Sequence, residues 1–240
     1  MELAANEPLA VAATNAVQQG DVDLVIRLLT ENPGLAAARI SDARMSRTLL
    51  HAATDWPGHY PNNAATIALL VEAGAEVDAR FAGPHIETAL HWAASSDDVE
   101  ALDALLDAGA DIEATGGVIG ASTPLADAVA FGQWRAAVRL VERGAKTDLW
   151  QAAALGLMDR IEEQFAGDEA PPPGEVTNAF WAACHGGQLE TAEYLLERGA
   201  DRNWVGHDGL TPLDAAERSG ASGLVEWLRR LGGESGKGHS

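Results

Sequence analysis

The stretch Thr88-Ala-Leu-His-Trp-Ala-Ala94, with Val99-Glu-Ala-Leu-Asp-Ala-Leu-Leu106 after a polar turn, decides the fold of this chain. Small alanines let the first segment approach neighbouring segments closely, while the leucine pair of the second segment fills an interior. The stretch closes with Asp107-Ala-Gly109-Ala-Asp-Ile-Glu113, whose glycine suits the left-handed backbone at the end of a helix. The pattern therefore predicts two short helices joined by a turn.

The pattern recurs along the chain. Clear copies begin at Thr48-Leu-Leu-His51, Thr123-Pro-Leu125 and Thr211-Pro-Leu213, and another runs through Trp181-Ala-Ala-Cys184. Two degenerate copies extend from Ala13 to Leu29 and from Trp150 to Phe165. Because a single unit cannot bury both of its faces, such units are expected to stack into a solenoid.

These residues resemble the consensus of the ankyrin-repeat family, in which a TPLHxAA start, a leucine pair and a Gly-Ala-Asp end recur every ~33 residues. The resemblance covers roughly residues 8 to 233. It implies an all-α fold, an ankyrin-repeat solenoid of about seven helix-turn-helix units with β-hairpin-like finger turns. Because the composition is rich in Ala and favours Arg over Lys, the resemblance is to members of bacterial type.

The repeat also predicts the domain organisation. We expect one ankyrin-repeat domain at residues 1–233, followed by a disordered Gly- and Ser-rich tail at residues 234–240. The approximate units are 8–41, 42–80, 81–114, 115–148, 149–166, 175–204 and 205–233. Prolines 171–173 stiffen the loop between the fifth and sixth units, and the sequence leaves open whether this loop bends the stack.

Composition limits the partners and the location. A formal charge of −20 and a pI near 4.5 disfavour binding to phosphate backbones, so we expect no nucleic-acid partner. No stretch approaches the ~18 apolar residues of a membrane span, and residues 1–17 lack the basic leader of an export signal. Cys184 is the one cysteine and cannot form an internal disulfide. A cytoplasmic protein without a membrane partner is predicted.

Several residues of the motif are expected to be structural. His51 and His91 occupy the histidine position of the family motif, which implies that each imidazole hydrogen-bonds neighbouring backbone and steadies the turn. Thr88, Thr123 and Thr211 precede their helices and are predicted to cap them. In the family, the binding surface is the concave side, formed by the finger turns and the C-terminal part of the first helices. Departures from the repeat on that side are therefore where we expect function.

The concave side carries several such departures. The second unit has extra residues at 55–63, which contain two prolines and a glycine and form a fixed loop. Two finger turns, at residues 81–87 and 115–121, are long for the family. The candidate ligand-binding residues on this side are Trp56, His59, Tyr60, Phe81, His85, Trp92, Asp97, Phe131, Trp150, Trp181, Trp204, His207 and Asp208.

Aromatic residues dominate this set. Indole rings supply large rigid contact areas, while His and Asp side chains fix the orientation of a bound group. Trp150 and Trp181 are read as replacements for the histidine of the motif, and the alternative is that they only plug the space it leaves. A purely structural role is likewise the alternative for Trp56 with His59.

Signatures of catalysis are missing from the sequence. There is no Gly-x-Ser-x-Gly elbow, no phosphate loop with its lysine and no recognised spacing of metal ligands, so we predict no metal and no cofactor. Cys184 and His185 are adjacent on one helix, so their side chains point about 100° apart, unlike a nucleophile and its base. The catalytic candidates are Asp127 and His185, which could transfer protons if both line a dry pocket walled by tryptophans.

The sequence thus favours a binding protein over an enzyme, although it leaves catalysis open. The leading hypothesis is a module that binds a protein or peptide segment in an aromatic-rich concave groove of the second to fourth units. Its expected anchors are Trp56, Tyr60, Phe81 and Trp92. The alternative is a small-molecule site, binding or acid–base catalytic, on the same face. A third interpretation is a passive scaffold whose aromatic surface is packed away.

Overall fold

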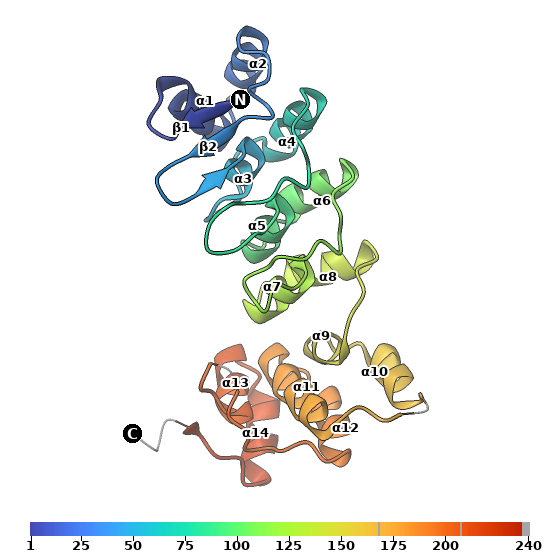
Figure 1. Cartoon of the computed structure of the whole chain (residues 1–240). Coiled ribbons are helices and arrows are strands. Elements are labelled where there is room, and N and C mark those ends of the chain that lie inside the picture. The colour runs from blue at the N-terminus through green and yellow to red at the C-terminus, as the bar shows by residue number, and fades with distance from the viewer. Residues whose placement is uncertain (168, 207, 237–240) are drawn as a thin grey trace. The chain divides into compact units, whose positions relative to one another are not determined.

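The computed structural model describes residues 1–167, 169–206 and 208–236, which form two compact units, Met1–Ala145 and Lys146–Ser240 (Figure 1). The first unit contains helices α1 to α8 and a small sheet, and the second contains helices α9 to α14. Within the described residues, no helix has the length and apolar character needed to cross a membrane.

The helices of the first unit come in pairs, as the repeat predicts. They are α1 (Pro8–Gln19), α2 (Val22–Glu31), α3 (Leu49–Thr54), α4 (Asn63–Glu72), α5 (Ala89–Ser95), α6 (Val99–Asp107), α7 (Pro124–Ala130) and α8 (Trp134–Glu142). The odd-numbered helices pack against one another in chain order, and the even-numbered helices form a second row beside them. This arrangement confirms stacked helix-turn-helix units.

Thr and His side chains fix the start of α3 and α5. Thr88 donates its backbone N–H to His91 Nδ1 at 3.1 Å, so Nδ1 is the acceptor and Nε2 carries the proton. His91 Nε2 lies 3.1 Å from the carbonyl oxygen of Ser122, and His51 Nε2 lies 3.2 Å from that of Glu87. Burial lowers the pKa of both imidazoles to about 4, so they are neutral at pH 7. The predicted structural role of these histidines is confirmed.

A small sheet accompanies the first finger. Strands β1 (Glu2–Ala4), β2 (Arg39–Ser41) and β3 (Ser46–Arg47) lie in this order, with β1 and β2 parallel and β2 and β3 antiparallel. The β2–β3 hairpin is the first finger, as the resemblance implies. Ser46 and Ala82 exchange backbone hydrogen bonds of 2.8 and 2.9 Å, so the second finger lies against the first.

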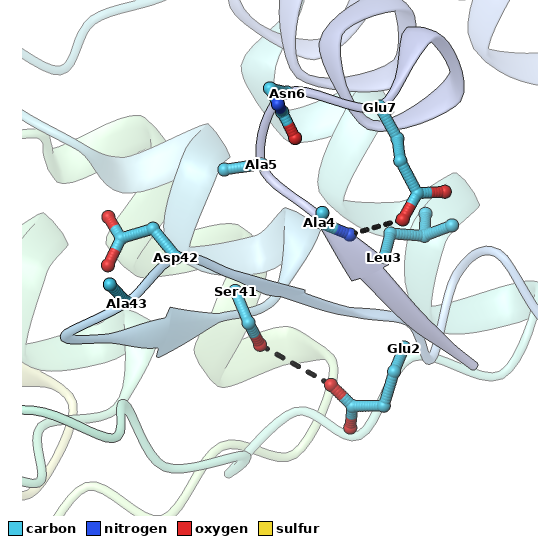
Figure 2. A pocket seen from close by; sticks show the side chains of 9 residues that line it. All are labelled: Glu2, Leu3, Ala4, Ala5, Asn6, Glu7, Ser41, Asp42 and Ala43. Carbon is cyan, nitrogen blue, oxygen red and sulfur yellow. Dashed lines mark hydrogen bonds between the residues drawn. The ribbon is translucent and has the colours of Figure 1, made fainter.

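An open hollow of the first unit lies beside this sheet (Figure 2). It has a volume of about 700 Å³ and is lined by residues 2–7 and 41–43. None of the side chains drawn in Figure 2 carries an aromatic ring or a positive charge. Glu7 already accepts the N–H of Ala4 at 2.6 Å, and Ser41 donates to Glu2 at 3.3 Å. This open surface therefore offers few anchoring groups for a ligand.

The second unit is built around its longest helix. The helices are α9 (Leu149–Leu155), α10 (Met158–Phe165), α11 (Pro173–Gly186), α12 (Leu189–Glu197), α13 (Pro212–Ser219) and α14 (Ser222–Arg230). Helix α11 packs between α9 and α13, and Phe180 is fully buried at its centre. A Cβ at Gly186 would overlap the carbonyl oxygen of Ala154, so glycine permits the close approach of α11 and α9.

The first residues of the expected tail fold back onto the second unit. Ser235 Oγ donates to Asp214 Oδ1 at 2.6 Å, and the Gly236 N–H donates to Oδ2 at 2.9 Å. Although burial alone would raise it, hydrogen bonds from Ser235, Gly236 and Thr211 lower the pKa of Asp214 to about 2. Residues 237–240 of the tail lie outside the described residues.

Candidate functional site

A pocket of about 260 Å³ lies on the first unit, where the 55–63 loop, the second and third fingers, and helices α5 and α7 meet. Four of the predicted ligand-binding residues line it, namely Trp56, His85, Trp92 and Phe131. Trp56 is 81% exposed and Phe131 is 47% exposed, so two rings are presented to solvent at its edge. The structure thus brings together residues that the sequence predicted separately.

One wall of the pocket is a fixed aromatic cluster. Trp92 packs edge-on against His51 at 5.0 Å between ring centroids and lies 5.4 Å from the ring of Phe81. Phe81 also stacks on His85 at 4.9 Å. Because Phe81 is only 4% exposed, it supports Trp92 from behind and is not among the residues that line the pocket. Such backing holds the indole in one orientation.

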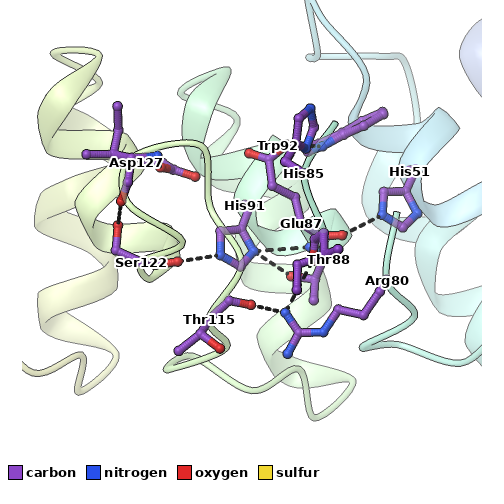
Figure 3. Close-up of polar contacts among 12 residues, drawn as sticks. His51, Arg80, His85, Glu87, Thr88, His91, Trp92, Thr115, Ser122 and Asp127 are labelled. Atoms are coloured by element: carbon purple, nitrogen blue, oxygen red, sulfur yellow. Dashed lines mark hydrogen bonds and ion pairs between the residues drawn. The ribbon is translucent and has the colours of Figure 1, made fainter. Parts of the chain in front are cut away.

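Two buried carboxyl groups lie next to this wall (Figure 3). Glu87 is 3% exposed, and its Oε2 accepts the indole N–H of Trp92 at 2.9 Å and lies 2.6 Å from His85 Nδ1. Asp127 is 0% exposed, and its Oδ1 accepts the N–H of Ile119 at 3.3 Å. No donor of the described residues serves Asp127 Oδ2. Asp127 is among the residues predicted from the sequence, and Glu87 is not.

The two carboxyl groups interact with each other. The charge of one disfavours ionisation of the other, because both are buried and lie close together. Burial, and then the charge of Glu87, raise the pKa of Asp127 to about 7. Burial likewise raises the pKa of Glu87. Burial thus disfavours the charged form of both acids.

The third finger closes over Asp127 because it contains glycines. A Cβ at Gly117 would lie 2.5 Å from Asp127 Oδ2, so only glycine lets the backbone approach the carboxyl group. Gly116 has a φ of +122° and packs against the carbonyl oxygen of Ile86 in the second finger. Glycines therefore shape the third finger.

The 55–63 loop is held by hydrogen bonds rather than by its aromatic residues. The His59 N–H donates to Asp98 Oδ2 at 2.7 Å, and His59 Nε2 lies 3.0 Å from the carbonyl oxygen of Ser96. Asp97 Oδ1 accepts the N–H of Ala136 at 2.7 Å, at the start of α8. His59, Tyr60 and Asp97 are not among the residues that line the pocket.

In the second unit, the histidine position is filled in two ways. Trp181 donates its indole N–H to the carbonyl oxygen of Leu210 at 2.8 Å, the kind of contact that the motif histidines make. In the fifth repeat this position belongs to Gln151, which exchanges hydrogen bonds of 3.0 and 3.1 Å with Asp148. Trp150, one residue earlier, is half-buried, and its replacement of the motif histidine stays a prediction.

The remaining predicted residues of the second unit form a polar chain. Arg218 donates to Asp208 Oδ2 at 2.8 Å and to His185 Nδ1 at 3.2 Å, and its guanidinium lies 5.8 Å from the ring of Trp181. His185 is buried, and Trp204 is half-buried. The predicted residue His207 lies outside the described residues. Asp127 belongs to the first unit and His185 to the second, and each has its observed partners within its own unit.

The described residues carry little that suggests other chemistry. Burial raises the pKa of the Cys184 thiol, which is fully buried in the core of the second unit. No group of three or more His, Cys, Asp or Glu side chains in the described part of the chain is placed to hold a metal ion.

Comparison with known families gives matches in both units. A family model described as ankyrin repeats in three copies matches residues 149–235, and a model of a single ankyrin repeat matches residues 86–116. Among solved structures, the ankyrin repeat domain of human ASB11 matches with a TM-score of 0.54 at 20% identity, over 93% of this chain and 98% of that one. This likeness shows the fold.

Two curated relatives from nematodes share the repeat. An ankyrin repeat and KH domain-containing protein of Caenorhabditis briggsae is 29% identical over 171 residues, which are 68% of this chain and 6% of that protein. An ankyrin repeat and KH domain-containing protein of Caenorhabditis elegans is 42% identical over 50 residues, 21% of this chain and 2% of that protein. The chain therefore spans a small part of the length of these relatives.

Proposed function

Because this chain belongs to the ankyrin-repeat family, we propose that it is a binding module whose first unit engages a protein or peptide segment through its concave groove. Ankyrin-repeat domains are generally protein–protein interaction modules. The groove consists of the pocket at Trp56 and Trp92 together with the exposed tips of the fingers. A partner of this kind needs large, fixed apolar anchors surrounded by polar groups.

The observation that carries the proposal is the exposure of large apolar side chains on these elements. Trp56, Phe131 and Val118 line the pocket, and Met45 and Ile86 are exposed on the first and second fingers. Soluble proteins bury such residues unless they form part of a binding surface or are scattered singly. Here three of them meet in one pocket, and Trp92 behind them is held rigidly.

The volume of the pocket favours a side chain over a whole metabolite. Pockets for drug-sized molecules measure roughly 300–1,000 Å³, whereas this one measures about 260 Å³. Asp127 is fully buried and is not among the lining residues, so a substrate in the pocket would not meet its carboxyl group. The small-molecule and acid–base alternatives therefore have less support than binding of a protein segment.

The test is selection of displayed peptides on the purified chain, followed by counter-selection on a Trp56→Ala/Trp92→Ala double variant. We expect the selected peptides to lose at least about tenfold in affinity for the double variant, which corresponds to about 1.4 kcal/mol. Val138→Ala is the matched control, because Val138 is exposed on α8 and does not line the pocket. Equal affinity for the chain and the double variant would refute the proposal.

We propose the cytoplasm as the setting, because the single cysteine, Cys184, is a free and buried thiol. The bacterial origin suggested by the composition stays a prediction, and the two curated relatives described above are from nematodes.

A further inference from the structure

The pocket of the first unit combines aromatic faces with carboxyl groups. Trp56, Trp92 and Phe131 supply the rings, and Asp55 and Glu87 supply the carboxyl groups. Aromatic rings attract cations through their negative faces, and carboxylates attract them through charge and hydrogen bonding. A lining of this composition suits a cationic group better than a purely apolar one.

The chain itself supplies no fixed positive charge to Glu87 within the described residues. The only basic side chain in an ion pair with Glu87 is His85. Arg47 forms its ion pair with Asp55, at 2.5 Å, at the rim of the pocket. Arg80, on the same finger as Glu87, donates to backbone carbonyl groups instead. The carboxyl group of Glu87 thus lacks a guanidinium or ammonium partner in the described structure.

Asp127 lies behind Glu87 and is a second acid without a cationic partner in the described residues. It is completely buried, its Oδ2 has no donor among the described residues, and it faces the carboxyl group of Glu87 (Figure 3). A second buried carboxyl group behind Glu87 brings further acceptor oxygens to this wall and no positive charge. This unpartnered buried oxygen is an observation separate from the composition of the pocket lining, and both favour a positively charged occupant.

We propose that the protein segment bound by the first unit presents an arginine, whose guanidinium enters this pocket, stacks on the tryptophan rings and donates to Glu87. The inference rests on the proposed function and names the chemistry of its partner. Arginine is favoured over lysine because a planar guanidinium stacks on aromatic rings and is weakly hydrated, whereas an ammonium does neither. The net charge of −20 would also speed the approach of a basic segment.

The pocket can be tested directly with small probes of defined charge. N-acetyl-arginine amide, N-acetyl-citrulline amide and N-acetyl-lysine amide are titrated into the full chain while the indole N–H signals of Trp56 and Trp92 are followed by NMR. We expect saturable shifts of both signals with the arginine probe in the millimolar range, weaker shifts with lysine and none with citrulline. Equal responses to arginine and citrulline would overturn the inference, because citrulline keeps the shape and loses the charge.

Two variants distinguish the effect of the Glu87 carboxyl group from the effect of the net charge of the chain. Glu87→Gln keeps an oxygen that can accept from Trp92, and we expect it to weaken arginine binding at least tenfold. Glu100→Gln removes an equal charge from the first turn of α6, away from the pocket, and should leave binding unchanged. If both variants lose affinity equally, only long-range charge is at work and the inference fails. Trp56→Ala, at a site 81% exposed, gives a second variant expected to fold normally.

The same peptide selection distinguishes this inference from the proposed function. Peptides that bind the chain and not the Trp56→Ala/Trp92→Ala variant should be enriched in arginine, and replacing that arginine by citrulline should cost at least tenfold in affinity. Peptides that depend on the groove but lack arginine would overturn the inference while leaving the proposed function in place.

Discussion

Trp92 in the first unit and Trp181 in the second both lie on the first helix of a repeat, yet their indole N–H groups serve different partners. Trp181 occupies the histidine position and donates to the backbone carbonyl of Leu210. Trp92 lies one position later than His91 and donates to the carboxyl group of Glu87 in a pocket wall. One indole completes the backbone hydrogen bonding of the stack, and the other positions a carboxyl group that can meet a ligand.

The comparison shows that a tryptophan in a repeat is not by itself evidence of a ligand site. The position that faces the next finger's carbonyl group demands a donor, and either an imidazole or an indole can supply it. The next position, which Trp92 occupies, does not have to donate to a backbone carbonyl group, so its residue can vary with function. Predictions about the two positions should therefore differ in kind, with stability changing at Trp181 and binding at Trp92.

The largest expected effect on stability is at Trp181. Trp181→Ala removes a large packed ring and leaves the Leu210 carbonyl oxygen without its donor, so we expect a loss of about 3–5 kcal/mol in the free energy of unfolding. Trp181→His should cost less, because an imidazole N–H can donate as His91 does to Ser122. Urea unfolding followed by circular dichroism measures both.

The losses of stability in the two Trp181 variants test whether the hydrogen bond to Leu210 matters. Equal losses for the Ala and His variants would mean that ring volume alone matters at this position and that the hydrogen bond does not. Trp56→Ala is the control, because that side chain is 81% exposed and its removal should change stability by less than about 0.5 kcal/mol.

A second effect distinguishes the imidazoles of the first unit from the indole of the second. The pKa of His51 and His91 is lowered from 6.5 to about 4, because burial disfavours the charged imidazole. As pH falls from 6.5 toward 4, the unfolded chain takes up these protons first, so stability is lost in that window. Each histidine accounts for about 3 kcal/mol once the pH is below 4. The indole of Trp181 does not titrate there.

His91→Gln tests this difference, since Gln151 fills the same position in the fifth repeat. The variant should be less stable than the parent chain at pH 7, by about 1 kcal/mol for the poorer fit. At pH 4.5 the gap should close or reverse, because glutamine does not titrate. Urea unfolding midpoints of both proteins at the two pH values measure this difference in stability. A difference that stays constant with pH would contradict a buried, neutral imidazole at position 91.

The paired helices and the Thr–His caps were predictable from sequence because both depend on local spacing. Thr88 and His91 lie within one helical turn, so their contact follows from the motif. The exposure of Trp56 also followed from the prolines and glycine of its loop. These features need no knowledge of which finger lies against which helix.

The carboxyl pair was not predictable in the same way. Glu87 ends one finger and Asp127 lies on the first helix of the next repeat, and they meet only because the third finger folds down over Asp127. Glu87 directly precedes the Thr88 cap, and the repeat motif specifies no side chain there, so the sequence does not mark it as a site residue. The burial of Phe81 depends likewise on packing against His85 and Trp92.

The smallest of the stability effects is at this pair and has the opposite pH dependence to the histidines. Burial and the charge of Glu87 raise the pKa of Asp127 from 3.8 to about 7, so the unfolded chain loses this proton first and stability falls as pH rises between those values. Asp127→Asn keeps the size of the side chain and cannot ionise. We expect it to raise the free energy of unfolding by about 2 kcal/mol at pH 8 and to change it little at pH 4. Thermal unfolding at both pH values would show an upward shift of the melting temperature at pH 8 alone. A stabilisation that is equal at both pH values would mean that packing under Gly117 is responsible, and that the pKa of Asp127 is not raised in the folded chain.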